Sequence, residues 1–222
     1  MKKLLVYVLC VYFLCACSDS AKEQDKSESA KLVESYPQIV ALLEKESAGD
    51  TQGEQSMRDA LQKAGVSNEQ IEEIGSLITR AKLSGYELIL PNDLAAKSDE
   101  FIIISTLPRG IYNLGLIPHA KHFEFALSPS LNDDGSEWNW EADGLSRAQK
   151  EFIELLGDNK DAKIVFYDSG EHIFAPVGSA HLGIMWAKHL GYTQLYRLVG
   201  GFDMWKELKL PITTEVPHCC EM

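Results

Sequence analysis

Cysteine, the side chain best suited to nucleophilic and sulfur chemistry, is confined to the two ends of this 222-residue chain. Three cysteines lie within the first 17 residues and two lie near the C-terminus: Cys10, Cys15, Cys17, Cys219 and Cys220. The thiolate is the reactive form of this side chain. A catalytic thiol in the folded part of the chain would therefore have to come from the C-terminal tail.

Acidic and polar side chains gather directly after the run at 163–167, which is apolar after Lys163 and typical of a buried strand. The candidate ligand loop that follows comprises Asp168, Ser169, Gly170, Glu171, His172, Gly178 and Ser179. One interpretation makes Asp168 a nucleophile or general base, with His172 or His181 as its partner. The sequence favours the other, in which Asp168 ends the strand and accepts N–H groups of the loop. We therefore assign no catalytic residue with confidence.

Histidines and carboxylates are scattered rather than set at the spacing of a metal site. The side chains that a metal site could use are His119, His122, His172, His181, Glu124, Asp168 and Glu171. None of them follows a compact ligand pattern. The sequence therefore predicts neither a metal nor a cofactor.

Two further groups keep several interpretations open. His218, Cys219 and Cys220 could bind a soft metal, form a disulfide or supply an acceptor thiol, and a functional role is the less favoured interpretation. Trp138 and Trp140 could mark a partner surface, although a loop held to the domain by two rings is the simpler interpretation.

The N-terminal residues are typical of an exported lipoprotein. Lys2 and Lys3 precede an uncharged apolar run that is too short to span a bilayer comfortably, as in a signal peptide. The ending Leu14-Cys15-Ala16-Cys17 resembles a lipobox. We expect residues 1–16 to be removed and Cys17 to carry lipid, which would anchor the chain to the cell membrane or outer membrane. The folded part would then face the periplasm or the exterior.

The formal net charge is −12, and no basic run follows the first three residues. Nucleic-acid binding requires clustered lysine and arginine, so the charge argues against a nucleic-acid partner. An envelope protein remains a possible partner.

The remaining chain divides into four parts. Residues 17–30 are short, polar and charged, as in a flexible tether. Residues 31–84 have helical periodicity and predict a helical extension, with a capping box at Ser67 and Gln70. Residues 86–215 alternate strand-like runs at 101–104, 163–167 and 195–199 with helix-like runs at 146–156 and 179–190. This alternation predicts an α/β domain with a mainly parallel sheet flanked by helices. Residues 216–222 form the tail.

Several motifs in residues 86–215 resemble those of the rhodanese-like family. Gly115-Leu116-Ile117-Pro118-His119-Ala120 is similar to the family's Gly-His-Ile-Pro-Gly-Ala turn. Leu190-Gly191-Tyr192, followed by Gly200-Gly201-Phe202-Asp203-Met204-Trp205 and Leu210-Pro211, is similar to the family's C-terminal pattern. The resemblance implies the rhodanese fold and, in active members, sulfur transfer through a persulfide on a cysteine.

The chain departs from the family at the positions that carry this chemistry. Active members have the catalytic cysteine directly after the strand that ends in tyrosine, where this chain has Asp168. The loop that follows is several residues longer than usual, with two acids and no arginine or lysine. The family's Asp-Val-Arg segment aligns with Ser105-Thr106-Leu107. These departures favour loss of sulfur transfer.

The sequence thus predicts a non-catalytic rhodanese-like lipoprotein for binding, scaffolding or sensing at the cell envelope. The alternative is an enzyme: a sulfurtransferase that uses a tail cysteine, or another reaction built on Asp168.

Overall fold

The computed structural model describes residues 31–45, 48, 50–125, 145, 147–170 and 177–215. Its centre is a sheet of five parallel strands in the order β1-β5-β4-β2-β3. The strands are β1 Glu87–Ile89, β2 Ile102–Ser105, β3 Lys121–His122, β4 Lys163–Tyr167 and β5 Gln194–Leu198. This confirms the predicted α/β fold with a mainly parallel sheet.

Alternating side chains of the central strand fill two cores. Ile164 and Phe166 of β4 pack on one face with Phe152 and Leu156 of α7 (Gln149–Leu156) and with α8 (Ser179–His189). Val165 and Tyr167 pack on the other face, with α5 (Pro91–Ala96) and α9 (Gly201–Glu207). Since neighbouring side chains of a strand point to opposite faces, a continuous apolar run such as 164–167 marks a strand covered on both sides. Two short elements, η1 (Ser98–Glu100) and α6 (Arg109–Tyr112), flank β2.

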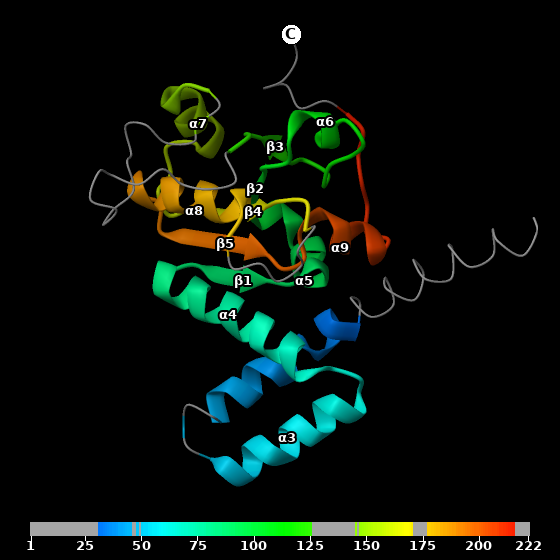
Figure 1. Cartoon of the computed structure of the whole chain (residues 1–222). Coiled ribbons are helices and arrows are strands. Elements are labelled where there is room, and N and C mark those ends of the chain that lie inside the picture. The colour runs from blue at the N-terminus through cyan, green and yellow to red at the C-terminus, as the bar shows by residue number, and fades with distance from the viewer. Residues whose placement is uncertain are drawn as a thin grey trace, which may run out of the picture.

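The predicted helical extension is confirmed as a separate layer (Figure 1). It contains a helix over residues 31–45, then α3 (Thr51–Lys63) and α4 (Asn68–Ser84), which lies beside β1. The predicted capping box is present: Gln70 N donates to Ser67 Oγ, and Ser67 N donates to Gln70 Oε1. Its core also includes Val199 and Met204 from the sheet domain, so the two layers share buried apolar surface.

Element limits differ from the predicted ones by a few residues where the backbone turns. The helix predicted from residue 146 begins at Gln149, because Ala148 has extended backbone angles. The strand predicted to end at Val199 ends at Leu198, and Gly200 then takes a left-handed conformation. The sequence does not predict β1, since this strand has only three residues and none of them is fully buried.

None of the helices in the described part of the chain is both long enough and apolar enough to cross a membrane. The predicted signal peptide, Cys17, the tether and the tail with His218, Cys219 and Cys220 lie outside the described residues. Glu171, His172, Trp138 and Trp140 lie outside them as well.

Candidate functional site

The candidate site lies at the carboxyl ends of β4 and β5, where Asp168 meets a buried arginine. Asp168 directly follows β4, and its Oδ2 accepts a hydrogen bond and ion pair from Arg197 Nη2 at 3.2 Å. The two side chains are only 17% and 5% exposed, respectively. The pairing of Phe166 with Arg197 in the sheet brings the two residues together. A cation so deeply buried requires a counter-charge, and Asp168 supplies it.

Gly178, the residue before α8, leaves room for this ion pair. A Cβ atom at residue 178 would lie 2.8 Å from Asp168 Oδ2 and 3.5 Å from Arg197 Nη2. Any other residue would push against the carboxylate. The structure therefore brings Asp168 and Gly178, both predicted for the loop, onto the same side of Arg197.

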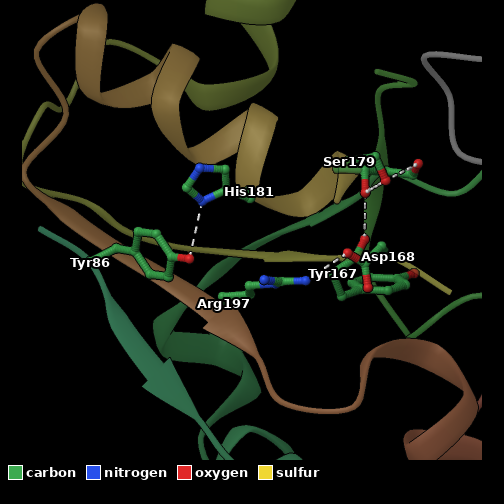
Figure 2. A network of polar contacts seen from close by, with 7 residues as sticks. Tyr86, Tyr167, Asp168, Ser179, His181 and Arg197 are labelled. Atoms are coloured by element: carbon green, nitrogen blue, oxygen red, sulfur yellow. Dashed lines mark hydrogen bonds and ion pairs between the residues drawn. The ribbon is translucent and has the colours of Figure 1, made fainter. Parts of the chain in front are cut away.

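Hydrogen bonds of two hydroxyl groups link the ends of β2 and β4 to the start of α8 (Figure 2). Thr106 Oγ1 donates to the carbonyl of Tyr167 at 3.0 Å and lies 2.8 Å from Ser179 Oγ. Thr106 N also donates to Tyr167 O, at 2.9 Å. Thr106 and Ser179 are both buried, so these contacts satisfy polar atoms that water does not reach. Ser179 thus holds the start of α8 to Thr106, which is itself bonded to the end of β4.

The loop after β4 lies directly against the Gly200-Gly201 turn that follows β5. Phe202 N donates to Asp168 O, and Asp203 N donates to Ser169 O. Gly170 has φ +80°, and a Cβ atom there would lie 2.1 Å from the carbonyl oxygen of Gly200. Gly201 has φ +55°, and a Cβ atom there would lie 2.7 Å from Gly170 N. These positions need glycine both for their backbone angles and for the close approach of the two chain segments.

On the other side of Arg197 lie Tyr86 and His181 (Figure 2). The Tyr86 hydroxyl and His181 Nδ1 share a hydrogen bond of 3.1 Å, and the positive charge of Arg197 acts on Tyr86. Burial lowers the pKa of His181 to about 4, and the charges of Arg197 and Arg80 act in the same direction. His181 is therefore neutral at physiological pH. Burial raises the pKa of Tyr86, so its hydroxyl also stays protonated.

Of the other histidines and acids named from the sequence, those that the structure describes do not gather at this site as metal ligands. His122 is buried, and its Nε2 is hydrogen-bonded to the carbonyl of Leu107 at 2.7 Å. Burial lowers the pKa of His122. Among the residues that the structure describes, no group of three or more His, Cys, Asp or Glu side chains is arranged to hold a metal ion.

Comparison with known proteins identifies the fold. A family model for the Rhodanese-like domain matches residues 90–208. The chain belongs to the rhodanese-like domain family. No curated protein matches it significantly.

Several solved structures resemble it at low sequence identity. A rhodanese-related protein from Thermoplasma volcanium is 13% identical, with a TM-score of 0.38, over 59% of this chain and all of that one. A Rhodopseudomonas palustris protein of unknown function, described as a possible tyrosine phosphatase, is 20% identical, with a TM-score of 0.40, over 63% and 93%. SseA from Escherichia coli, described as a 3-mercaptopyruvate sulfotransferase, is 23% identical, with a TM-score of 0.41, over 60% and 53%.

Sequence reasoning misses two residues of the site in this rhodanese-like domain. It groups Arg197 with the apolar residues of its strand and treats Tyr86 only as the start of the domain. A charged side chain at a position flanked by Leu195 and Leu198 is a signal, because buried charges are rare unless they are paired. No comparable signal marks Tyr86, since its role depends on packing against α8.

Proposed function

We propose that the protein is a cell-envelope lipoprotein whose rhodanese-like domain binds a ligand or partner and does not transfer sulfur. The ion pair between Asp168 and Arg197 is the observation that carries this proposal. Asp168 occupies the position at which active members of the family have cysteine, and a carboxylate cannot hold a persulfide.

The surroundings of Asp168 support the same conclusion. An incoming thiosulfate or persulfide anion would meet a carboxylate, and like charges oppose binding. Arg197, the cation next to this position, already engages Asp168. Ser105, Thr106 and Leu107, which replace the family's Asp-Val-Arg, are all buried. The replacements therefore belong to the packed interior and leave no charged group of that motif for an anionic substrate.

A sulfur-transfer assay tests the proposal on the full chain. Thiosulfate would give its sulfane sulfur to cyanide, with thiocyanate and sulfite as products. We expect no thiocyanate above the uncatalysed background, for the wild type and equally for Cys219→Ser and Cys220→Ser. Clear turnover that disappears in either variant would instead establish a sulfurtransferase that uses a tail cysteine. Turnover that persists in both but disappears in Asp168→Asn would establish a reaction built on Asp168.

Anchoring through lipid on Cys17 is tested separately. In cells fed a labelled fatty acid, we expect the wild-type chain to take up label and to sediment with membranes. Cys17→Ala should abolish the label and release the chain, whereas Cys15→Ala, a matched change two residues earlier, should leave both unchanged. Labelling and membrane retention that survive in Cys17→Ala would refute this anchor.

A further inference from the structure

The outward face of α4 carries an arrangement that the proposed function does not use. Ile74, Leu77, Ile78 and Ala81 turn inward, whereas the opposite side of the helix is exposed. That exposed side presents Glu72, Ser76, Thr79, Arg80 and Leu83. Leu83 is 77% exposed, so it adds an apolar side chain to this face.

These residues line one side of an open groove of about 650 Å³. Its other side is formed by Leu43 of the helix over 31–45 and by Arg58 of α3. Gly75 places no side chain in the groove, where a Cβ atom would already be in contact with the Leu43 side chain at 3.6 Å. The groove therefore has an apolar floor, small residues along its centre and an exposed leucine at one end.

Two opposite charges lie at equal distances along the helix on either side of Ser76. Glu72 lies four residues before Ser76 and Arg80 lies four residues after it, so both charges are on nearly the same side of the helix, about one turn from the centre. Within the described residues, neither Glu72 nor Arg80 takes part in an ion pair. A face with an acid at one end and a base at the other is complementary to itself when it is reversed.

We propose that this groove is the interface of a homodimer in which two copies of α4 pack antiparallel, with the twofold axis at Ser76. Glu72 of each copy then faces Arg80 of the other, so the same ion pair forms twice, as an isologous interface requires. Leu83 of each copy comes opposite residue 69 of the other, beside the Ile71 and Glu72 end of its groove. The small side chains of Ser76 and Thr79 at the centre allow the two helix axes to approach closely.

The charge pattern favours a second copy over a partner of a single charge. Arg58, the other charged residue that lines the groove, is paired with Glu54 of its own helix at 3.1 Å. An acidic partner would be repelled at Glu72 and a basic one at Arg80, because each would place like charges together at one end of the groove. Only a surface that carries both charges in reversed order satisfies both ends. This chain carries such a surface.

Charge reversal gives a test that folding defects cannot imitate. Sedimentation velocity would be measured on the full chain in non-ionic detergent, with a reductant to keep the cysteines from cross-linking. We expect wild-type dimers, and dissociation constants at least about tenfold higher for Glu72→Arg and for Arg80→Glu. In each single variant both ion pairs are replaced by like charges. In an equimolar mixture of the two variants every pair is again opposite, so heterodimers should form.

Lys63→Glu, an exposed charge reversal on α3 outside the groove, is the matched control and should dimerise like the wild type. A wild-type chain that remains monomeric up to about 0.1 mM would overturn the proposal. Equally, variants that stay apart when they are mixed would show that any dimer forms through another surface.

Discussion

At the scale of single residues, Arg197 connects the two halves of the candidate site. Its guanidinium lies between Asp168, on the loop side, and Tyr86, which in turn contacts His181 (Figure 2). The side chain of Arg197 is only 5% exposed, so water solvates its charge poorly. These neighbours must therefore stabilise the buried charge. Asp168 is therefore a structural partner of Arg197.

Removal of this cation should destabilise the protein. Arg197→Met keeps most of the side-chain volume but leaves the Asp168 carboxylate unpaired, and we expect the free energy of unfolding to fall by about 2–4 kcal/mol. Urea unfolding measures the change. Asp168→Asn in the Arg197→Met background removes the unpaired charge, so the double variant should lose less than the sum of the two single losses. Strictly additive losses would contradict a direct interaction between the two side chains.

The histidine on the other side of Arg197 should make stability depend on pH. Its pKa is about 4 in the folded protein, against an ordinary value near 6.5, so protonation favours the unfolded chain. The stabilisation is complete above about pH 6.5 and is lost as the pH falls towards 4, by up to about 3 kcal/mol. Unfolding free energies measured between these pH values should decline less steeply for His181→Gln than for the wild type. Parallel declines would assign the effect to other groups, such as His122.

At the scale of elements, the candidate site depends on how closely two turns approach. The loop after β4 and the Gly200-Gly201 turn after β5 lie against each other through backbone atoms, without side chains between them. This contact orients Asp168 towards Arg197 before α8 begins. The backbone contact gives a physical reason for the Gly200-Gly201 pair in the family resemblance. The pair is needed for the fold, whichever residue follows β4.

Gly170→Ala should therefore be far more costly than an equivalent change at an open glycine. The new methyl group would collide with the carbonyl of Gly200, and the positive φ adds strain, so we expect a loss of about 3 kcal/mol or more. Gly191 has a similar φ of +89°, but a Cβ atom there would meet nothing within 4 Å, so Gly191→Ala should cost only about 1–2 kcal/mol. Urea unfolding of the two variants compares them. Equal losses would mean that backbone strain alone matters.

At the scale of the whole molecule, the helical extension and the sheet domain form a continuous structure. Val199 and Met204 of the domain are buried among apolar residues of the helix over 31–45, α3 and α4. Tyr86, which follows α4, hydrogen-bonds to His181 in α8.

This shared core predicts cooperative unfolding. Helical and aromatic circular dichroism signals should change together in one urea transition of the wild-type chain. Met204→Ala, which leaves a cavity between the layers, should lower the free energy of unfolding by about 2–4 kcal/mol. Lys206→Ala, an exposed change in the same helix, should have little effect. Two separate transitions in the wild type would show that the extension folds independently.

The sequence by itself determined the family, the limits of the central strand β4, and the helix starts that depend on nearby residues. β4 has the predicted limits, the capping box of α4 is present, and α8 begins at the predicted residue. Such features follow from periodicity, capping and turn residues within a few positions of one another, so they can be found without a structure.

The partners of Asp168 were decided only by the tertiary structure. Asp168 and Arg197 are 29 residues apart, and parallel pairing of β4 with β5 brings them into contact. The link from Tyr86 to His181 spans 95 residues and depends on how α8 packs over the sheet. Long-range register leaves no periodic trace in the sequence, so the sequence determined that a carboxylate follows β4, and the fold decided what this carboxylate binds.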